Sequence, residues 1–327
     1  MTAPEKLQSI LDDAVARGEE HSCQLAVYRD GELFCDLAAG EADTRTIFPL
    51  FSAGKGPMIT AVLRLVGRGV LQLDAPVARY WPEFAANGKE HITLRDVLTH
   101  RSGMHILPPA TFAELADWDH MCALLASRRP VGTPGTRTRY QPVTFAWLAG
   151  EPARRAAGKD LAALIRDEAL APAGITDFHY GVSPADEERT IGIHYPPEAA
   201  EDWRVRFIGE NAVRRSCIPS ANAFGTARSL AAHYMAVLDG LLPPELLTEA
   251  LTPPDRSADP VKGWERFGLG YILWEGNAFG HGGALGAEGF AVPDRRIAVG
   301  FATETLADEH PVRDRVSEAL DLPPRHW

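Results

Sequence analysis

A serine and a lysine stand one helical turn apart near the start of an apolar segment of this chain. Residues 48–69 read FPLFSAGKGPMITAVLRLVGRG, and Ser52 is followed three residues later by Lys55. Residues three apart share a helix face, so the amine lies within hydrogen-bond reach of the hydroxyl. A partly desolvated lysine can be neutral and take the serine's proton, which makes the hydroxyl a nucleophile. The spacing therefore indicates acyl-transfer chemistry at Ser52.

The position of Ser52 before a helical pattern adds to this chemistry. A serine at a helix N-terminus places its own N–H, and the positive end of the helix dipole, where an oxyanion would form. The motif alone does not decide the question, because a helix-capping serine followed by a solvated lysine has the same spacing. The decision therefore depends on other segments of the chain.

Two further segments favour the catalytic interpretation. PGTRTRYQP places Tyr140 after a Pro-Gly turn, and FGHGGALGAEGF ends a strand pattern with His281-Gly282-Gly283. With these segments the sequence resembles the serine β-lactamase and penicillin-binding-protein superfamily, whose nucleophile motif is S-x-x-K. Within it, the chain is similar to the class C-like branch with its D-aminopeptidases, esterases and acyltransferases. The resemblance covers nearly the whole chain and includes LQLDAPVARYWPEF, ITLRDVLTHRSGM and GTARSLAAHYMAVL.

The resemblance implies a role for each matching residue. Ser52 would be the acylated nucleophile, Lys55 would share its proton, and Tyr140 would be the base that later protonates the leaving group. The positive charge of Lys55 could lower the pKa of the Tyr140 phenol to near neutral pH and so stabilise the tyrosinate. Backbone N–H groups of Ser52 and Ala284 would form the oxyanion hole. The implied substrate-binding residues are Gln141, His281, Gly282 and Gly283.

Two positions depart from the pattern of the β-lactamases. The family's tyrosine motif is Y-x-N, and its asparagine holds the amide side chain of β-lactams and peptides, but here Gln141 and Pro142 follow the tyrosine. Proline has no side-chain hydrogen bond to offer, which leaves Gln141 as a substitute. His281 stands where the β-lactamases have the lysine of K-T-G, a substitution frequent in the esterase-like members. Together these changes favour an ester or thioester substrate over a penicillin.

Composition and charge limit the partners. The chain has 327 residues, 45% of them hydrophobic, and a formal net charge of -11. A chain with this net negative charge has no excess of basic residues with which to bind nucleic acid or an anionic membrane surface. The N-terminal segment has scattered acidic residues and no apolar core of signal-peptide length, and no stretch contains eighteen consecutive apolar residues. We therefore expect a cytoplasmic protein whose partner is a small acyl compound: an ester, a thioester or an amide.

No pattern of metal or cofactor ligands is present. The four cysteines have no C-x-x-C spacing, and we expect free thiols in a reducing compartment. They are Cys23, Cys35, Cys122 and Cys217. Six histidines without ligand spacing are expected to be structural or solvated. They are His91, His100, His105, His194, His233 and His310. With no P-loop and no dinucleotide fingerprint either, the sequence predicts activity without metal or cofactor.

Strand patterns at both ends of the chain enclose a helical middle. A helix is expected over 4–17, a hairpin of two alternating runs around Asp30-Gly31, and a helix from Ser52, while strand runs return after residue 239. The sequence therefore predicts an α/β (α+β) fold of the β-lactamase type, with an antiparallel sheet flanked by helices. Residues 1–67 and 213–327 would form that domain, and 68–212 an inserted, mostly helical domain. The catalytic groups are expected between the two.

Hypotheses from two classes of protein remain. The first is a serine acyl-enzyme hydrolase of esters or an acyltransferase acting through Ser52, with a β-lactamase or D-amino-acid peptidase as the alternative. A water acceptor gives hydrolysis, and a bound alcohol or amine gives transfer. The second is an inactive homologue that serves as a binding protein. The presence of Ser52, Lys55 and Tyr140 together favours the enzyme.

Overall fold

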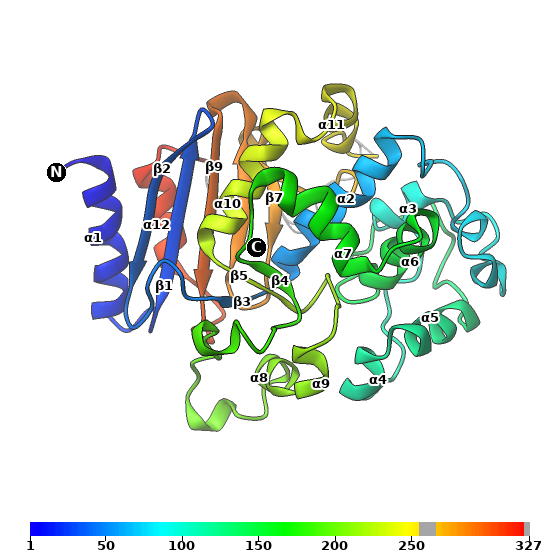
Figure 1. Cartoon of the computed structure of the whole chain (residues 1–327), viewed down its shortest axis with the longest axis horizontal. Coiled ribbons are helices and arrows are strands. Elements are labelled where there is room, and N and C mark those ends of the chain that lie inside the picture. Colours follow the sequence, from blue (N-terminus) through cyan, green and yellow to red (C-terminus); the bar gives the residue numbers. More distant parts are fainter. Residues whose placement is uncertain (255–265, 324–327) are drawn as a thin grey trace.

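An antiparallel sheet of six strands forms the centre of the molecule (Figure 1). The computed structural model describes residues 1–254 and 266–323. The strand order is β2-β1-β9-β8-β7-β6, so the hairpin of the N-terminal segment pairs with the last strand of the chain. The bounds are Cys23–Arg29 for β1, Glu32–Ala39 for β2, Ile272–Leu273 for β6, Phe279–Gly282 for β7, Glu288–Val292 for β8 and Ile297–Thr303 for β9.

Helices cover both faces of this sheet (Figure 1). Helices α1 (Ala3–Ala16) and α12 (Pro311–Ala319) pack on one face, and α10 (Ala227–Ala236) packs on the other. The side chains of strand β9 pack against helices on both faces. Val299 and Phe301 belong to the cluster under α1 and α12, whereas Ala298 and Ala302 belong to the main core. Alternate residues of a strand point to opposite faces. The expected fold class is confirmed.

Several local predictions agree with the structure. The helix expected over 4–17 is α1, which begins at a capping box formed by Thr2 and Glu5. The turn at Asp30-Gly31 joins β1 and β2, with φ of 50° and 90°, as a hairpin turn of positive φ requires. The strand Phe279–Gly282 also lies where the sequence predicts it.

A smaller sheet leads into the candidate site. Its order is β3-β5-β4, with β3 at Phe48–Phe51, β5 at Ala223–Gly225 and β4 at Phe178–Tyr180. Strand β3 continues into a 3-10 turn, Ser52–Gly54, and then into α2, Lys55–Gly67. Helix α2 is buried on nearly every side over its first nine residues, Lys55–Leu63. The segment with Ser52 and Lys55 is therefore a core element, not a surface helix.

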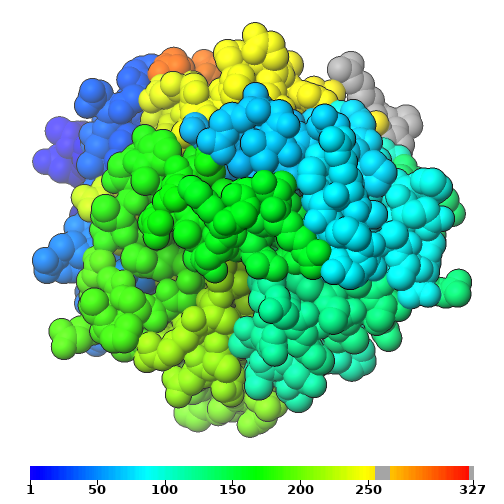
Figure 2. Space-filling model, turned by 45° about the vertical axis from the view of Figure 1, so that its right-hand side comes forward, coloured from blue at the N-terminus to red at the C-terminus, as the bar shows by residue number. Residues whose placement is uncertain are grey.

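The segment 68–212 is mainly helical, and Figure 2 shows that it covers much of one face of the molecule. It contributes β4 to the smaller sheet, whereas every described strand of the larger sheet lies in 1–67 or 213–327. One hydrophobic core crosses these boundaries and includes Ile59 and Trp147. The division into two domains stays a prediction. The helices of the segment are α3 Leu94–Leu98, α4 Phe112–Ala116, α5 Trp118–Ser127, α6 Phe145–Ala157, α7 Leu161–Ile165, α8 Trp203–Gly209 and α9 Asn211–Arg214, and a further helix, α11, spans Pro244–Ala250.

Two features of the segment 68–212 were not predicted. The helical pattern of residues 108–130 forms two helices, α4 and α5, because Asp117 is extended and its side chain caps α5 by accepting from the N–H of His120. Helices α8 and α9 lie where the sequence shows aromatic residues without a clear helical period. Residues of both α4 and α8 line the candidate site.

Candidate active site

A strained turn presents Ser52 at the end of β3. Phe51 has φ 47° and ψ −128°, a conformation that costs a residue with a side chain about 1–3 kcal/mol. Three residues later, a Cβ on Gly54 would lie 2.3 Å from the Cβ of Ala223, so the turn packs against β5 only with glycine there. The chain therefore reverses sharply at Phe51 and begins a helical turn at Ser52, as the sequence predicts for a nucleophile before a helix.

The Lys55 amine is fully buried and lies between three oxygens. Its Nζ is 2.9 Å from Ser52 Oγ, 2.7 Å from the Pro142 carbonyl and 2.8 Å from the Ser220 carbonyl. Burial lowers the pKa of Lys55 well below its usual value. A neutral amine has two N–H groups for the two carbonyls, and its lone pair can accept the Ser52 proton. This geometry suits a base directed at the Ser52 hydroxyl.

Ser220 is a functional position that sequence reasoning missed. Its carbonyl accepts hydrogen bonds from both Ser52 Oγ, at 2.9 Å, and Lys55 Nζ, while its own hydroxyl donates to the Val143 carbonyl. The contribution comes from a backbone oxygen, and a backbone oxygen leaves no mark in the residue types.

Tyr140 lies beside the Ser52–Lys55 pair. The Lys55 Nζ is 5.0 Å from the centre of its ring, and the ring stacks on Phe267 at 5.5 Å. Burial raises the pKa of Tyr140 above that of a free phenol, and a hydrogen bond with Ser52 acts in the opposite direction. The burial of Tyr140 favours the protonated phenol, and the role of Tyr140 as the base stays a prediction.

His100 holds Tyr140 in place from behind. It is fully buried, with φ 56°. Its ring packs edge to face with the rings of Tyr140 and Phe267, and the ring centres lie 5.2 Å and 4.3 Å apart. Burial lowers its pKa well below the usual value. His100 is thus one of the structural histidines that the sequence predicts, although it packs directly against a candidate catalytic residue.

Gln141 does not reach the substrate side, which corrects the prediction of a substrate-binding role. Its side chain is fully buried. The amide oxygen accepts from Ser102 Oγ at 2.5 Å, and the amide nitrogen donates to the Val97 carbonyl at 2.9 Å and faces His100 Nδ1 at 3.0 Å. Because these partners occupy the amide, Gln141 cannot replace the asparagine of the Y-x-N motif.

Strand β7 supplies the opposite side of the site. The side chain of His281 is buried, and its Nδ1 lies 2.8 Å from the Gly282 carbonyl. Burial lowers the pKa of His281 well below its usual value, so no cation replaces the missing lysine. A Cβ on Gly283 would lie 2.2 Å from the Leu50 carbonyl, so glycine lets this strand end approach β3. The same stretch brings Ala284 to the site, as predicted.

These groups surround one pocket of about 330 Å³. Ser52, Tyr140, Ser220 and His281 are its polar lining side chains, and none of its lining residues in the described part of the chain carries a charge. The rest of the lining is largely apolar and comes from elements far apart in the sequence. It includes Phe51, Leu107, Phe112, Leu115, Trp203, Phe207, Phe267 and Ile272. A serine nucleophile thus faces an apolar, uncharged cavity.

This combination of fold and site defines the class of serine hydrolases that are built on the β-lactamase frame. The sequence model of the Beta-lactamase family matches residues 7–321. The chain belongs to this family.

Similar proteins include both esterases and penicillin-binding-protein homologues. The chain is 34% identical to the esterase/beta-lactamase LipL of Mycobacterium tuberculosis, over 86% of this chain and 76% of that protein. It is 28% identical to the esterase EstB of Burkholderia gladioli, over 82% of this chain and 78% of that protein. The crystal structure of a family VIII carboxylesterase superposes with a TM-score of 0.87 and 28% identity, covering 98% of this chain and 97% of that one.

A penicillin-binding-protein homologue from Caulobacter crescentus is equally similar, with a TM-score of 0.87, 29% identity and coverage of 98% and 97%. Similarity in fold therefore does not separate esterases from penicillin-binding-protein homologues, so the two classes have to be distinguished by the pocket. Within the described part of the chain, no helix combines the length and the hydropathy that crossing a bilayer requires.

Proposed function

We propose that this protein is a serine carboxylesterase that hydrolyses esters of apolar acyl or aryl groups through an acyl-enzyme on Ser52. The observation that carries the proposal is the uncharged, apolar lining of the pocket around Ser52. An ester has no N–H that needs a partner and no carboxylate that needs a cation, so such a pocket can bind it without leaving a polar group unpaired. The names of LipL, EstB and the family VIII carboxylesterase support an esterase.

In the acylation step, Ser52 Oγ attacks the ester carbonyl carbon while neutral Lys55 takes the hydroxyl proton across 2.9 Å. The N–H groups of Ser52 and Ala284 stabilise the oxyanion. The carbon–oxygen bond to the leaving group then breaks, and the alkoxide takes a proton from Tyr140, which Lys55 replenishes. The products of this step are a free alcohol and an acylated Ser52.

Deacylation repeats the sequence with water in place of the serine hydroxyl. Water gives its proton to the Lys55–Tyr140 pair as it attacks the acyl carbon, and Ser52 recovers its proton as the acyl bond breaks. An alcohol or amine that enters the pocket in place of water would give transfer of the acyl group. The acceptor is therefore decided by what the apolar pocket admits at this step.

The pocket disfavours β-lactams and D-amino-acid peptides. A penicillin carries a carboxylate and an acylamino group, but His281 is neutral and Gln141 has its amide turned away. Loss of one or two such polar contacts costs about 1–3 kcal/mol each. We expect kcat/KM for a short aryl ester to exceed that for a chromogenic cephalosporin by at least ~100-fold.

The test is steady-state hydrolysis of an aryl acetate and a chromogenic cephalosporin by the same preparation. Comparable efficiencies would assign the protein to the β-lactamases or peptidases. No turnover of either compound, with a correctly folded protein, would support a binding protein instead. Adding an alcohol to the ester assay and following the transfer product separates an acyltransferase from a hydrolase.

We also propose that the protein works in a reducing compartment, the cytoplasm. The four cysteines are free, and Cys23 and Cys35 do not pair across the hairpin, because Cys23 lies opposite Ala39 and Cys35 opposite Val27. Free thiols are typical of the cytosol. Fractionation of the producing cells with antibody detection would check the location.

A further inference from the structure

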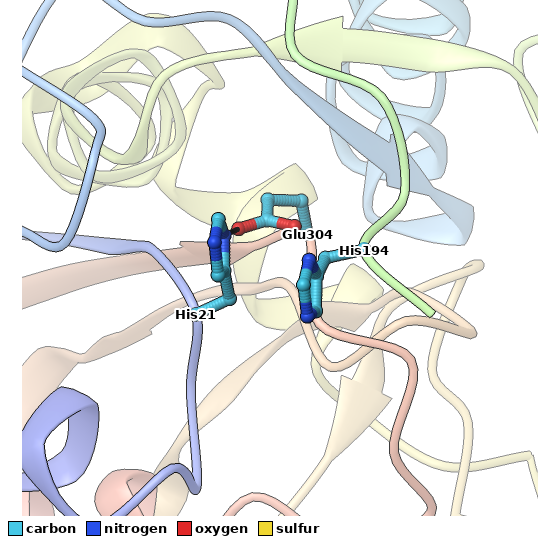
Figure 3. Close-up of side chains that lie close together, drawn as sticks. All are labelled: His21, His194 and Glu304. Atoms are coloured by element: carbon cyan, nitrogen blue, oxygen red, sulfur yellow. Dashed lines mark hydrogen bonds and ion pairs between the residues drawn. The ribbon is translucent and has the colours of Figure 1, made fainter. Parts of the chain in front are cut away.

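Two histidines and a glutamate that are not part of the pocket lining meet where β1 begins and β9 ends. His21 lies between α1 and β1, Glu304 follows β9, and His194 belongs to the segment before α8. One atom of each that can bind a metal lies within 4.8 Å of the other two. Figure 3 shows the two imidazole rings face to face, with the Glu304 carboxylate alongside them. This group is called the histidine–glutamate cluster below.

We propose that the histidine–glutamate cluster binds a divalent transition-metal ion, with zinc as the fitting case. Two imidazole nitrogens and one carboxylate oxygen form a ligand set that such ions accept, while magnesium and calcium prefer oxygen alone. Since His194 is exposed, a water can complete the coordination from the solvent side. The site is distinct from the Ser52 pocket, and none of its three residues lines that pocket.

The distances within the cluster suit a metal after a small movement. His21 Nδ1 and Glu304 Oε1 lie 2.9 Å apart. Two ligand atoms bound to the same zinc ion lie about 3.0–3.4 Å apart when each is about 2.1 Å from the metal. The rings of His21 and His194 are stacked at 3.9 Å with an angle of 4° between their planes. Only His194 has to rotate appreciably, and as an exposed side chain it is free to do so.

The three ligands are held on ordered backbone. The His194 N–H donates to the Glu304 carbonyl at 2.7 Å, and the Leu306 N–H donates to the His194 carbonyl at 2.8 Å. The His21 N–H donates to Thr305 Oγ1 at 2.8 Å. These bonds tie the segment at 194, the end of β9 and the end of the N-terminal helix segment together before any ion binds, so little order has to be gained on binding.

The burial of Glu304 favours a cation at this place. Its side chain is only 2% exposed and pairs with His21, which carries a charge only when protonated. A buried carboxylate is costly unless a positive group compensates it. A zinc ion between Glu304 and the two imidazoles supplies that charge at all pH values where the histidines are neutral.

A bound ion would fasten one wall of the pocket. The segment after His194 leads to α8, whose Trp203 and Phe207 line the pocket and whose Arg204 donates to the Ala284 carbonyl at 3.3 Å. The ion would therefore link this segment to β1 and β9 of the larger sheet. We expect it to act on stability and on the order of the α8 segment, not on the chemistry at Ser52.

The test is calorimetric titration of zinc into chelator-treated protein without a histidine tag. We expect one equivalent to bind with a Kd of about 10 μM or tighter. Affinity should fall at least ~10-fold in His194→Ala and in Glu304→Gln, because each removes a ligand. His91→Ala, which removes an exposed histidine elsewhere, is the matched control and should bind as the wild type does.

A second readout locates the ion. At zinc 100-fold above the wild-type Kd the midpoint of thermal unfolding should rise by about 4 °C in the wild type and by about 2 °C or less in His194→Ala. Anomalous diffraction at the zinc edge should give a peak between His21, His194 and Glu304. The proposal is overturned by absence of stoichiometric binding, by binding that His194→Ala and Glu304→Gln leave unchanged, by equal loss in His91→Ala, or by a peak elsewhere.

Discussion

The floor of the pocket and its wall are built in opposite ways. The floor, defined as Ser52, Lys55, Tyr140 and Ser220, is joined by short hydrogen bonds around a fully buried amine. The wall is apolar and comes mainly from α4, α8 and the residues around them. It consists of Leu107, Phe112, Leu115, Trp203 and Phe207. The floor can move protons, whereas the wall can only offer shape and apolar contact.

This contrast separates chemistry from choice of substrate. The floor fixes the nucleophile and its base in one geometry, which serves any acyl compound that reaches Ser52. The wall and the uncharged His281 decide which compounds reach it. Changes to the floor should therefore lower kcat for every substrate, and changes to the wall should alter KM for some substrates only.

The largest effect is expected on the floor. Lys55→Ala and Tyr140→Phe should each lower kcat/KM for an aryl acetate by at least ~100-fold, the usual scale for a group that transfers protons. Lys55→Arg should be as slow as Lys55→Ala, because a guanidinium stays charged. Circular dichroism of each variant shows whether the fold survives. A variant of Lys55 that keeps wild-type activity would break the assignment of the base.

The pH profile follows from the same burial. Only the neutral amine of Lys55 can accept a proton, and burial lowers the pKa of this group well below that of a free lysine. Activity should be present above the lowered pKa and be lost as the pH falls through it, well below the range in which a free lysine titrates. An activity that rises only near the pKa of free lysine would contradict a buried neutral base.

A smaller effect is expected where floor and wall meet, at Pro142. The carbonyl of this residue holds Lys55, and its ring lines the pocket. Pro142→Asn keeps the carbonyl and adds an amide, so kcat/KM for a chromogenic cephalosporin should rise by about 10-fold, equivalent to one polar contact. Pro142→Ala is the matched control, since it removes the ring without adding a donor. An equal rise in both variants would attribute the change to space and not to the amide.

The wall itself is tested at Trp203. This side chain is 54% exposed, and its ring packs edge to face with that of Phe51, with the ring centres 5.9 Å apart. Its removal should therefore spare the fold. Trp203→Ala should raise KM for aryl or long-chain esters by about 10-fold and leave KM for a small acetyl ester nearly unchanged. Leu33→Ala, an exposed apolar residue on β2, is the control. A fall in kcat for all esters would place Trp203 with the floor.

The same contrast explains what the sequence could and could not predict. Ser52 and Lys55 are three residues apart, so local periodicity alone brings them together. Tyr140 required the resemblance to a family, because its neighbours in space are distant in sequence. The sheet built from both chain ends followed from strand-like apolar runs, as in β8 and β9, which are buried at every position.

Other features had no signal in a single sequence. The Ser220 contribution is a carbonyl, and no residue type is required to supply one. Gln141 was expected to face the substrate, but a polar side chain turns toward whichever partners the fold provides, here Ser102 and Val97. The spacing of histidines along the sequence gives no sign of a pair at His21 and His194, because these residues meet only through long-range packing.

The smallest effect is expected on removal of metal. Neither floor nor wall holds a metal-ligand set within the described residues, and the histidine–glutamate cluster lies outside the pocket lining. Treatment with a chelator should leave kcat for a small acetyl ester within about two-fold of the untreated rate, on the scale where ten-fold is about 1.4 kcal/mol. A loss of activity that zinc restores would mean that the reaction itself uses the ion.

The most direct test of the central claim is the intact mass of the protein after reaction with a fluorophosphonate, followed by peptide mapping. An activated serine forms a stable phosphonyl adduct, so wild-type protein should gain the mass of one adduct, located on Ser52. Ser52→Ala, with the same fold, should gain none and should have no esterase activity. An adduct that persists in Ser52→Ala, or that maps to another residue in the wild type, would contradict the account.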